Sequence, residues 1–548
     1  MNTKSYTSGI SEIPLLGETI GQNLKKTVLK FPEREALVVP HQDYRVNYLE
    51  FWTQVTSASK SLVSSGIKKA DRVGIWSPNR YEWVIIQYAT ARIGAILVNI
   101  NPAYKSSGLE YDLSQSGTKL LFRSKGFRQT DYSVIIDEIK DNLPELQKII
   151  VIDDEWNDFI KTGKNLTDDE IDKIESTLNF DDPINIQYTS GTTGLPKGAT
   201  LSHHNILNNG FHVGERLNYT ENDRVCIPVP FYHCFGMVMG NLSSTSHGAC
   251  MVIPGEFFEP LQTLKTVEKE KCTSLYGVPT MFIAELEIPE INSFDFSSLR
   301  TGIMAGAPCP VETMKDVISK MNMKDVAICY GMTETSPVST MTFPDDPFAK
   351  RVGSVGKVMP FLEVKIIDPA SKEIAPINTQ GELCTRGYSV MKGYWNDPQN
   401  TALNIDKNGW MHTGDLAEMD NDGYIAITGR IKDLIIRGGE NISPREVEEF
   451  LMTHEAVTEA YVIAVPSQRY GEEVCAWVKI KYGTALSPEE LTAFCKGRID
   501  TFKIPRYWKF VEDFPTTVTG KIRKVEMREI SSKELNLEDF RLLREQKG

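Results

Sequence analysis

The sequence predicts an α/β protein with two domains. The large N-terminal domain is expected to hold several subdomains, with parallel-rich sheets and a β-rich segment, and the small C-terminal domain is again α/β. The chain has 548 residues, 41% apolar and 24% charged, which suits several globular domains. Helical and strand patterns alternate over roughly the first 350 residues, as in proteins with parallel sheets. Short β-like segments separated by Gly, Pro and Asn-Asp turns then dominate, and a compact α/β unit follows.

The alternating part should contain amphipathic helices and short buried strands. Ser202 precedes one helical stretch and is a good N-cap. We predict helices over residues 49–65, 81–93, 134–143, 264–271 and 314–321, and strands over residues 71–76, 95–99, 148–152, 184–188, 274–277 and 325–330.

The second part of the chain is expected to be richer in strands. We place the domain boundary near residues 430–432, which gives a large domain over residues 1–430 and a small one over residues 431–548. We predict strands over residues 362–367, 381–385, 424–428, 461–465, 473–481 and 508–511, and helices over residues 446–452 and 488–499.

Composition excludes several classes of function. The net charge of −13 argues against nucleic-acid binding and means that an anionic substrate needs local basic patches. Nine cysteines without a CxxC pair indicate reduced thiols in a cytosolic compartment. No signal or transit segment and no transmembrane run is evident, so we expect a cytoplasmic protein without an integral membrane segment. The sequence leaves open whether the protein contacts a membrane transiently and whether it forms a homodimer.

Residues 188–199, YTSGTTGLPKGA, form the most informative segment. They place four aliphatic hydroxyl side chains, three glycines and Lys197 between two apolar runs. Glycine lets backbone N–H groups approach phosphate oxygens, the hydroxyls donate hydrogen bonds and the lysine adds a charge. The segment lacks the Gly-Lys-Ser/Thr ending of a Walker A loop. It therefore predicts a polyphosphate-binding loop of another kind, and a flexible surface linker is the alternative.

Residues 330–335, YGMTET, follow a predicted strand. Ligand contacts in α/β folds gather where strands end. Glu334 between two threonines could hold Mg²⁺ through oxygen, and a solvated turn is the alternative.

Two further positions fit a nucleotide ribose. Asp415 follows a glycine turn, and its carboxylate could accept both ribose hydroxyls. Arg430 is expected to contact the same ribose. An aspartate at a turn is also common without any ligand.

Two glycine-containing segments lie near the C-terminus. Residues 429–442 read GRIKDLIIRGGENI, which alone is consistent with a strand and a glycine hairpin. Residues 515–521 end in Lys521 on a tight Thr-Gly-Lys loop. An isolated lysine is normally a solvated surface charge.

Three more segments complete the set. Residues 228–236 contain Tyr232 and His233, although a lone histidine is more often structural. Residues 302–308 form a small-residue loop. Residues 393–395, GYW, are interpreted as structural.

Together these motifs resemble, in order and spacing over residues 188–521, the adenylate-forming superfamily of acyl-CoA synthetases, luciferases and peptide-synthetase adenylation domains. Further details, such as residues 11–18, 494–497 and 502–505, resemble the medium-chain acyl-CoA ligases of that superfamily nearly end to end. No catalytic motif departs from the family pattern.

The resemblance implies roles for named residues. It implies that Lys521, Glu334, Thr189 and His233 are catalytic, that Glu334 helps hold the metal, and that the small domain turns about Lys432. The implied acyl pocket is lined by Tyr232, His233, Gly306, Ser336 and Val338. The implied ATP and cofactor contacts are Thr189, Ser190, Gly191, Thr192, Thr193, Gly194, Lys197, Gly306, Ala307, Pro308, Tyr330, Gly331, Met332, Thr333, Asp415, Ile427, Arg430, Lys432, Gly438, Gly439, Glu440 and Lys521.

The implied reaction uses ATP, Mg²⁺ and CoA. A fatty acid of medium chain length would be activated to acyl-AMP with release of pyrophosphate and then transferred to CoA. After the turn, residues 437–441 would face the active site. A basic cluster on the small domain could take the CoA phosphates, or it could be an ordinary solvated face: Lys496, Arg498, Lys503, Arg506 and Lys509.

Other functions stay open at this point. An aryl- or branched-acid CoA ligase, or an acyl-AMP ligase that loads a carrier protein, would use the same motifs. A non-catalytic acyl-nucleotide binding protein would not need Glu334, Asp415, Arg430 and Lys521 together. A phosphoryl-transfer enzyme would be expected to carry a Walker A loop.

Overall fold

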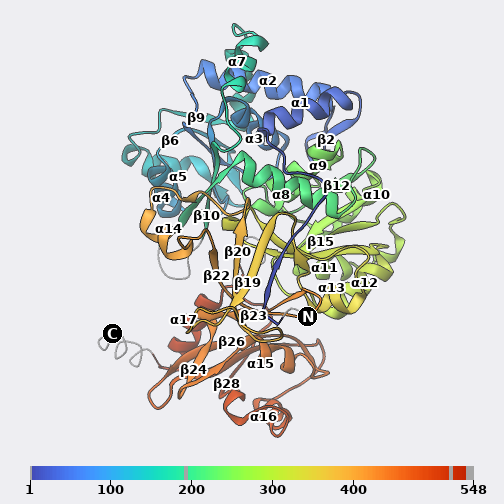
Figure 1. Ribbon diagram of the computed structural model, residues 1–548, viewed down its shortest axis with the longest axis vertical. Helices are drawn as coiled ribbons and strands as arrows, with labels where there is room; N and C mark the ends of the chain where they lie inside the picture. The colour runs from blue at the N-terminus through green and yellow to red at the C-terminus, as the bar shows by residue number, and fades with distance from the viewer. Residues whose placement is uncertain (1–2, 190–194, 517–521, 538–548) are drawn as a thin grey trace. The chain divides into compact units, whose positions relative to one another are not determined.

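The computed structural model describes residues 3–189, 195–516 and 522–537. It divides into two compact units (Figure 1). One holds residues 6–364 and 384–412, and the other holds the described residues of 1–5, 365–383 and 413–548. We call them the larger and the smaller unit. The division falls elsewhere than the predicted boundary at residues 430–432, which stays a prediction together with the hinge at Lys432.

A seven-stranded sheet forms one part of the larger unit. Its order is β21-β11-β10-β5-β4-β6-β9, and β10, β5, β4, β6 and β9 run parallel. β11 pairs antiparallel with both of its neighbours. The bounds are β4 Arg72–Trp76, β5 Ile96–Asn99, β6 Thr118–Arg123, β9 Lys148–Val151, β10 Pro183–Thr189, β11 Lys197–Ser202 and β21 Gly393–Tyr394.

A nine-stranded sheet forms a second part of this unit. Its order is β18-β17-β16-β15-β14-β12-β13-β2-β3, and the strands from β16 to β2 run parallel. Their carboxyl ends therefore lie along one edge of the sheet. The bounds are β2 Glu35–Val39, β3 Tyr44–Asn47, β12 Arg224–Cys226, β13 Cys250–Val252, β14 Ser274–Gly277, β15 Thr301–Ala305, β16 Asp325–Gly331, β17 Val338–Met341 and β18 Lys357–Val358.

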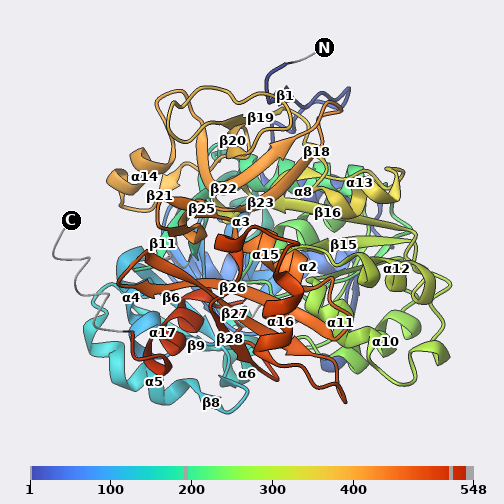
Figure 2. The same ribbon diagram turned by 90° about the horizontal axis from the view of Figure 1, so that it is seen from below.

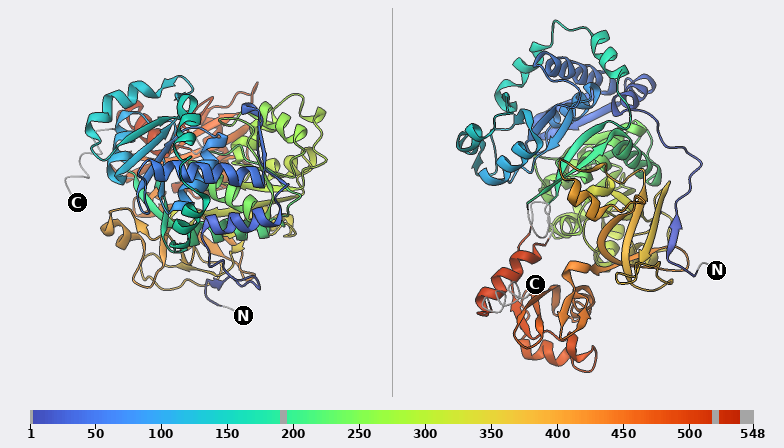
Figure 3. Two further views of the ribbon diagram at one scale, coloured as in Figure 1. Left: turned by 90° about the horizontal axis from the view of Figure 1, so that it is seen from above. Right: turned by 60° about the vertical axis from the view of Figure 1, so that its left-hand side comes forward.

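Helices cover these sheets, and Figure 3 shows α1 and α2 lying together in blue. Ser202 caps α8 as predicted, because its side chain accepts the N–H of Asn205 in a capping box. A π-helix over Phe235–Leu242 precedes α9 and was not predicted. The bounds are α1 Ile20–Lys30, α2 Tyr48–Ser64, α3 Tyr81–Ile93, α4 Ser106–Ser116, α5 Tyr132–Ile139, α6 Ile152–Thr162, α7 Asp168–Ser176, α8 His203–Arg216, α9 Ser243–His247, α10 Pro260–Lys269, α11 Pro279–Leu286, α12 Val311–Lys320, α13 Phe348–Gly353 and α14 Pro398–Asn404.

A five-stranded sheet follows the order β1-β19-β20-β22-β23. The division between the units falls within β19, β20 and β22. A separate short hairpin joins β7 Gly126–Phe127 to β8 Thr130–Asp131. The bounds of the five strands are β1 Tyr6–Ser8, β19 Leu362–Ile367, β20 Gly381–Gly387, β22 Met411–Met419 and β23 Ile425–Arg430.

The C-terminal part of the smaller unit is a sheet with helices on both faces (Figure 2). Alternate residues of β26 point to opposite faces, as the period of a strand requires. Ala460 and Val462 pack with residues of α15 and α16, whereas Ile463 and Val465 pack with Met527 of α17. The bounds are β24 Ile435–Arg437, β25 Glu440–Ile442, β26 Val457–Ser467, β27 Gly471–Ile480, β28 Tyr507–Phe510, α15 Pro444–Leu451, α16 Pro488–Cys495 and α17 Lys524–Glu534.

The predicted α/β class is confirmed, and two local predictions need correction. Lys197 was assigned to a loop but begins β11, because the chain returns antiparallel to β10 with Thr189 paired to Lys197. The helix predicted over residues 488–499 ends at Cys495, and Gly497 has a φ of 72°, which a right-handed helix excludes.

Candidate active site

Glu334 lies at the end of a strand in the larger unit. β16 ends at Gly331, and a short 3-10 turn over Thr333–Thr335 carries the glutamate inward, so that only 5% of it is exposed. Its Oε1 accepts hydrogen bonds from the hydroxyls of Thr189, at 3.2 Å, and Tyr394, at 2.9 Å. A buried carboxylate is thus held by two hydroxyl donors.

The predicted phosphate loop begins beside this carboxylate. Thr189 is the last residue of β10 in the seven-stranded sheet, whereas Glu334 follows a strand of the nine-stranded sheet. The fold therefore joins two motifs 145 residues apart. Five predicted contacts lie outside the described residues: Ser190, Gly191, Thr192, Thr193 and Gly194.

Lys197 lies on the other side of the hairpin. Its Nζ donates to Oδ1 of Asn400 at 2.7 Å and lies 5.3 Å from the centroid of the Tyr394 ring. Because Tyr394 also contacts Glu334, this tyrosine links the lysine and the carboxylate. Burial and the nearby Glu334 charge raise the pKa of Tyr394 well above its usual range, so it remains a neutral donor.

Segment 393–395 was interpreted as structural, and the hydroxyl of Tyr394 within it bonds to the Glu334 carboxylate. The hydroxyl–carboxylate contact connects residues 60 positions apart, and only the fold brings them together. Asn400 was not singled out at all. The signal for Tyr394 was its place in the family-like motif, whereas the sequence held no signal for Asn400.

Two other predicted segments lie at the same edge of the nine-stranded sheet. Tyr232 and His233 follow β12, and Gly306 follows β15. Tyr232 is half-buried and His233 is exposed, and their rings lie 5.4 Å apart. Gly306, Ala307 and Pro308 are exposed, and Gly306 has a φ of 90° that favours glycine.

The segment around Glu334 is shaped by close backbone contacts. A Cβ on Gly331 would lie 1.7 Å from the carbonyl oxygen of Pro337, so this position needs glycine. Tyr330 and Met332 are half-buried and Thr333 is buried. Val338 is buried, and its backbone N–H and carbonyl are both bonded to the Asn209 side chain.

Ser336 was predicted to line the acyl pocket. Its hydroxyl donates to the carbonyl of Ser389 at 2.6 Å, and the residue is fully buried. The hydroxyl is therefore already bonded to the backbone.

In the smaller unit Asp415 and Arg430 form an ion pair. β22 and β23 place them directly opposite each other, and the Arg430 Nε lies 2.7 Å from the Asp415 Oδ1. Asp415 is 5% exposed, whereas Arg430 is exposed. Their contact with a ribose stays a prediction.

The remaining described residues predicted for the smaller unit lie in β23, in a 3-10 turn and in the hairpin of β24 and β25. The Ile427 carbonyl accepts a hydrogen bond from Arg445, and Lys432 is exposed in a 3-10 turn over Ile431–Asp433. Lys521 lies outside the described residues. Gly438, Gly439 and Glu440 are exposed in the hairpin between β24 and β25.

The predicted basic cluster is partly neutralised by carboxylates. Lys503 pairs with Glu446 at 2.6 Å and with Asp500 at 2.9 Å. Lys509 pairs with Glu534 at 2.5 Å. The cluster therefore offers less positive charge than the sequence count suggested.

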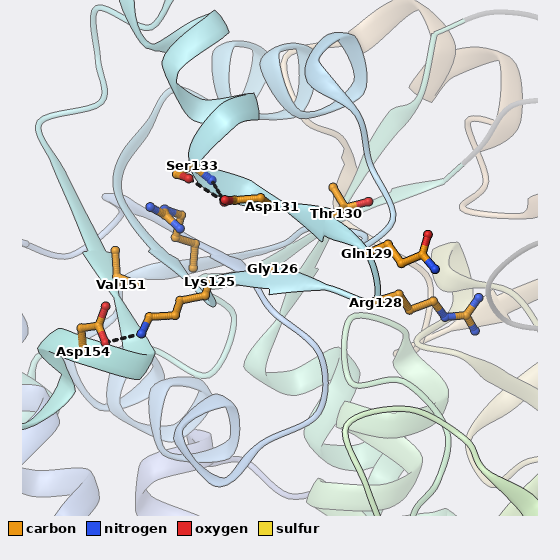
Figure 4. Close-up of a pocket in the computed structure, with 10 residues that line it drawn as sticks. Lys125, Gly126, Arg128, Gln129, Thr130, Asp131, Ser133, Val151 and Asp154 are labelled. Atoms are coloured by element: carbon orange, nitrogen blue, oxygen red, sulfur yellow. Dashed lines mark hydrogen bonds and ion pairs between the residues drawn. The ribbon is translucent and has the colours of Figure 1, made fainter.

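A cavity of about 550 Å³ lies within the larger unit (Figure 4). It is formed at the ends of β6 and β9 and at the β7–β8 hairpin, and no predicted site residue lines it. Cations and carboxylates are mixed there, and Lys125 pairs with Asp154 at 2.6 Å.

All nine cysteines are free thiols, and eight of them are buried. Among the described residues, no helix has the length and apolar character needed to cross a membrane.

Comparison with known proteins identifies the family. The model of the AMP-binding enzyme family matches residues 24–395, and that of the AMP-binding enzyme C-terminal domain matches residues 446–521. The chain belongs to the AMP-binding enzyme family. The resemblance of the motifs to adenylate-forming enzymes is thereby confirmed.

Relatives in this family have informative names. A putative acyl-CoA synthetase, YngI of Bacillus subtilis, is 47% identical over 95% of this chain and 99% of its own length. The mitochondrial medium-chain acyl-CoA ligase ACSF2 of Danio rerio is 43% identical over 98% of this chain and 92% of its own. ATP-bound MatB from Rhodopseudomonas palustris is 26% identical, with a TM-score of 0.82 over 95% of this chain and 100% of that chain.

The predicted enzyme class, an AMP-forming acid–CoA ligase, is confirmed by this membership and by the relatives' names. The acid itself is a separate question. The cytoplasmic location stays a prediction, since the ACSF2 relatives are named mitochondrial.

Proposed function

We propose that this AMP-binding enzyme activates a medium-chain fatty acid with ATP to acyl-AMP, releases pyrophosphate, and transfers the acyl group to CoA. The contact of Glu334 with Thr189 carries the proposal. It brings the expected metal ligand to the first residue of the expected phosphate loop, at 3.2 Å. The name of the ACSF2 relatives supports the medium-chain acid, and the ATP-bound MatB supports ATP.

The chemistry explains why such a site is needed. A carboxylate is a poor acyl donor, because its leaving group would be oxide. Attack of its oxygen on the α-phosphorus of ATP expels pyrophosphate and gives a mixed anhydride whose leaving group is AMP. The obstacle is electrostatic, since an anion must approach a polyanion, and positioning with charge stabilisation is the remedy.

The residues around Glu334 fit Mg²⁺. Within the described part of the chain no hydrogen bond is made to the Glu334 Oε2, so this oxygen of a buried carboxylate is available to a hard cation. Magnesium usually takes one or two carboxylates together with substrate phosphates. When bound, the ion would neutralise phosphate charge.

The described residues have separate tasks in the first step. Thr189 and Tyr394 orient the Glu334 carboxylate through its Oε1, which leaves Oε2 for the ion. Lys197 adds positive charge near the phosphates, once its contact with Asn400 is exchanged for one with ATP. Asp415 accepts the ribose hydroxyls while Arg430 holds it. Outside the described residues, Lys521 is assigned the bridge between the fatty-acid carboxylate and the α-phosphate.

The second step forms the thioester. The CoA sulfur attacks the acyl carbonyl carbon, AMP leaves with the bonding electrons, and the thiol proton passes to solvent. We propose that the small domain turns about Lys432 for this step and that residues 437–441 then face the acyl-AMP. The alternatives are an aryl- or branched-acid ligase and an acyl-AMP ligase that loads a carrier protein.

A pyrophosphate-release screen with straight-chain, branched and aromatic acids, with and without CoA, tests the proposal. Each methylene buried in the acyl pocket should gain about 0.8 kcal/mol until the pocket ends. Specificity should therefore rise about fourfold per methylene and then fall. A preference for aromatic acids, or acyl-AMP that never passes to CoA, would favour an alternative.

A further inference from the structure

The glycine hairpin formed by β24 and β25 is bonded to the neighbouring strand β27. Its tip holds Gly438 and Gly439, with φ values of 62° and 95°. These conformations suit glycine and give the tip little stiffness of its own. A defined shape must therefore come from contacts with the rest of the unit.

A buried carboxylate provides the main contact. Glu473 lies on β27 with only 1% of its side chain exposed, and its Oε2 accepts a hydrogen bond from the Arg437 Nε at 2.7 Å. The Arg506 guanidinium lies 3.8 Å from its Oε1. Arg437 directly precedes the glycine turn, opposite Glu440 of β25 and Gly471 of β27.

A second residue fastens the tip itself. The Gly438 N–H donates to the Tyr470 carbonyl at 2.9 Å, and the Arg437 guanidinium lies 4.3 Å from the Tyr470 ring centroid. The Arg437 side chain and the Gly438 backbone at the turn are therefore both bonded to neighbouring residues. The Arg437 guanidinium is therefore paired with the Glu473 carboxylate.

Burying an ion pair is costly, and an apolar pair of similar size often stabilises a fold as well. Such a pair is therefore better explained by a need for one defined conformation than by stability. We propose that Glu473 is a positioning residue for thioester formation, and that through Arg437 it holds residues 437–440 in the shape this step requires. The inference rests on the proposed function, in which this hairpin serves the second step only.

The two half-reactions separate this role from a general effect on folding. In the full-length Glu473→Gln variant, acyl-CoA formation from synthetic acyl-AMP and CoA should fall at least tenfold in kcat/KM for CoA. Pyrophosphate release from fatty acid and ATP should stay within about twofold, with unchanged KM for ATP. Arg437→Gln should behave likewise, and the double variant should be no slower than either single variant, because both remove one interaction.

Two further variants keep the test decisive. Asp513→Asn breaks an exposed surface pair with Lys479 in the same unit and should change neither half-reaction. If Glu473→Gln does not fold, Arg437→Lys keeps the charge but loses the guanidinium geometry, and it should slow only the CoA step.

Any one of three results would overturn the inference. They are equal losses in both half-reactions of folded variants, an unaffected CoA step, and independent losses that multiply in the double variant. The last result would make Arg437 a CoA ligand instead. Failure of the wild-type enzyme to form acyl-CoA from acyl-AMP would overturn the proposed function.

Discussion

The Glu334→Gln substitution tests the core of the proposed site. It removes one negative charge but keeps the shape of the side chain. The glutamine amide oxygen can still accept hydrogen bonds from Thr189 and Tyr394, which lie 3.2 and 2.9 Å from the Glu334 Oε1. Local structure should therefore survive, and the lost charge should dominate the effect.

The expected size follows from the position of the charge. Two unit charges about 4 Å apart interact by about 4 kcal/mol at an effective dielectric constant of about 20. That energy corresponds to about 10³-fold, since about 1.4 kcal/mol is tenfold. Because Glu334 is only 5% exposed, water replaces little of this energy. Adenylation should fall about 10²–10³-fold, the range for losing one preorganised electrostatic group.

The assay is pyrophosphate release with a medium-chain acid, ATP and increasing Mg²⁺. The variant should need more Mg²⁺ for half-maximal rate and should keep the wild-type Tm within a few degrees. Glu363→Gln is the matched control, because this carboxylate pairs with Arg386 at a more exposed place in the same unit. A folded Glu334→Gln variant with more than half of the wild-type rate and unchanged Mg²⁺ dependence would refute the reasoning.

Three further predictions concern other parts of the chain. Asp415→Ala should weaken the use of ATP by about 1.5–3 kcal/mol, the scale of a charge-assisted hydrogen bond, with little change in the KM for fatty acid; unchanged ATP kinetics would exclude a ribose contact. Lys521→Ala should lower acyl-AMP formation by at least about 10²–10³-fold but leave the reaction of synthetic acyl-AMP with CoA near the wild-type rate; equal losses in both half-reactions would contradict its role in the first step. His203 is fully buried, and burial lowers its pKa to about 3. Because the unfolded state then binds more protons, stability should fall as pH drops from about 6.5 towards 3, by up to about 1.4 kcal/mol per pH unit, and His203→Gln should flatten this slope in urea unfolding if the histidine causes it.

Local elements were the most predictable part of this protein. The helix predicted over residues 81–93 is α3, and Ser202 caps α8 through a capping box. The strand predicted over residues 274–277 is β14. Propensity, hydrophobic pattern and capping act over a few neighbouring residues, so the sequence records them directly.

Residues typical of turns also indicated much of the candidate site, but they did not indicate which segments meet there. Glu334 was predicted from a polar segment after a strand, and Asp415 from a glycine turn. The pattern could not say that the two threonine-containing segments around Thr189 and Glu334 meet, since they belong to different sheets. That contact depends on how the sheets pack.

The partners of the predicted residues were decided by the tertiary structure alone. Tyr394 reaches Glu334 across 60 residues, and Asn400 holds Lys197 across 203. The pairing of Arg437 with Glu473 joins strands 36 residues apart. The motifs and the chemistry they suit could be predicted because they depend on residue type and short spacing. The partners could not, because long-range contacts depend on sheet order, register and burial, which only the folded chain fixes.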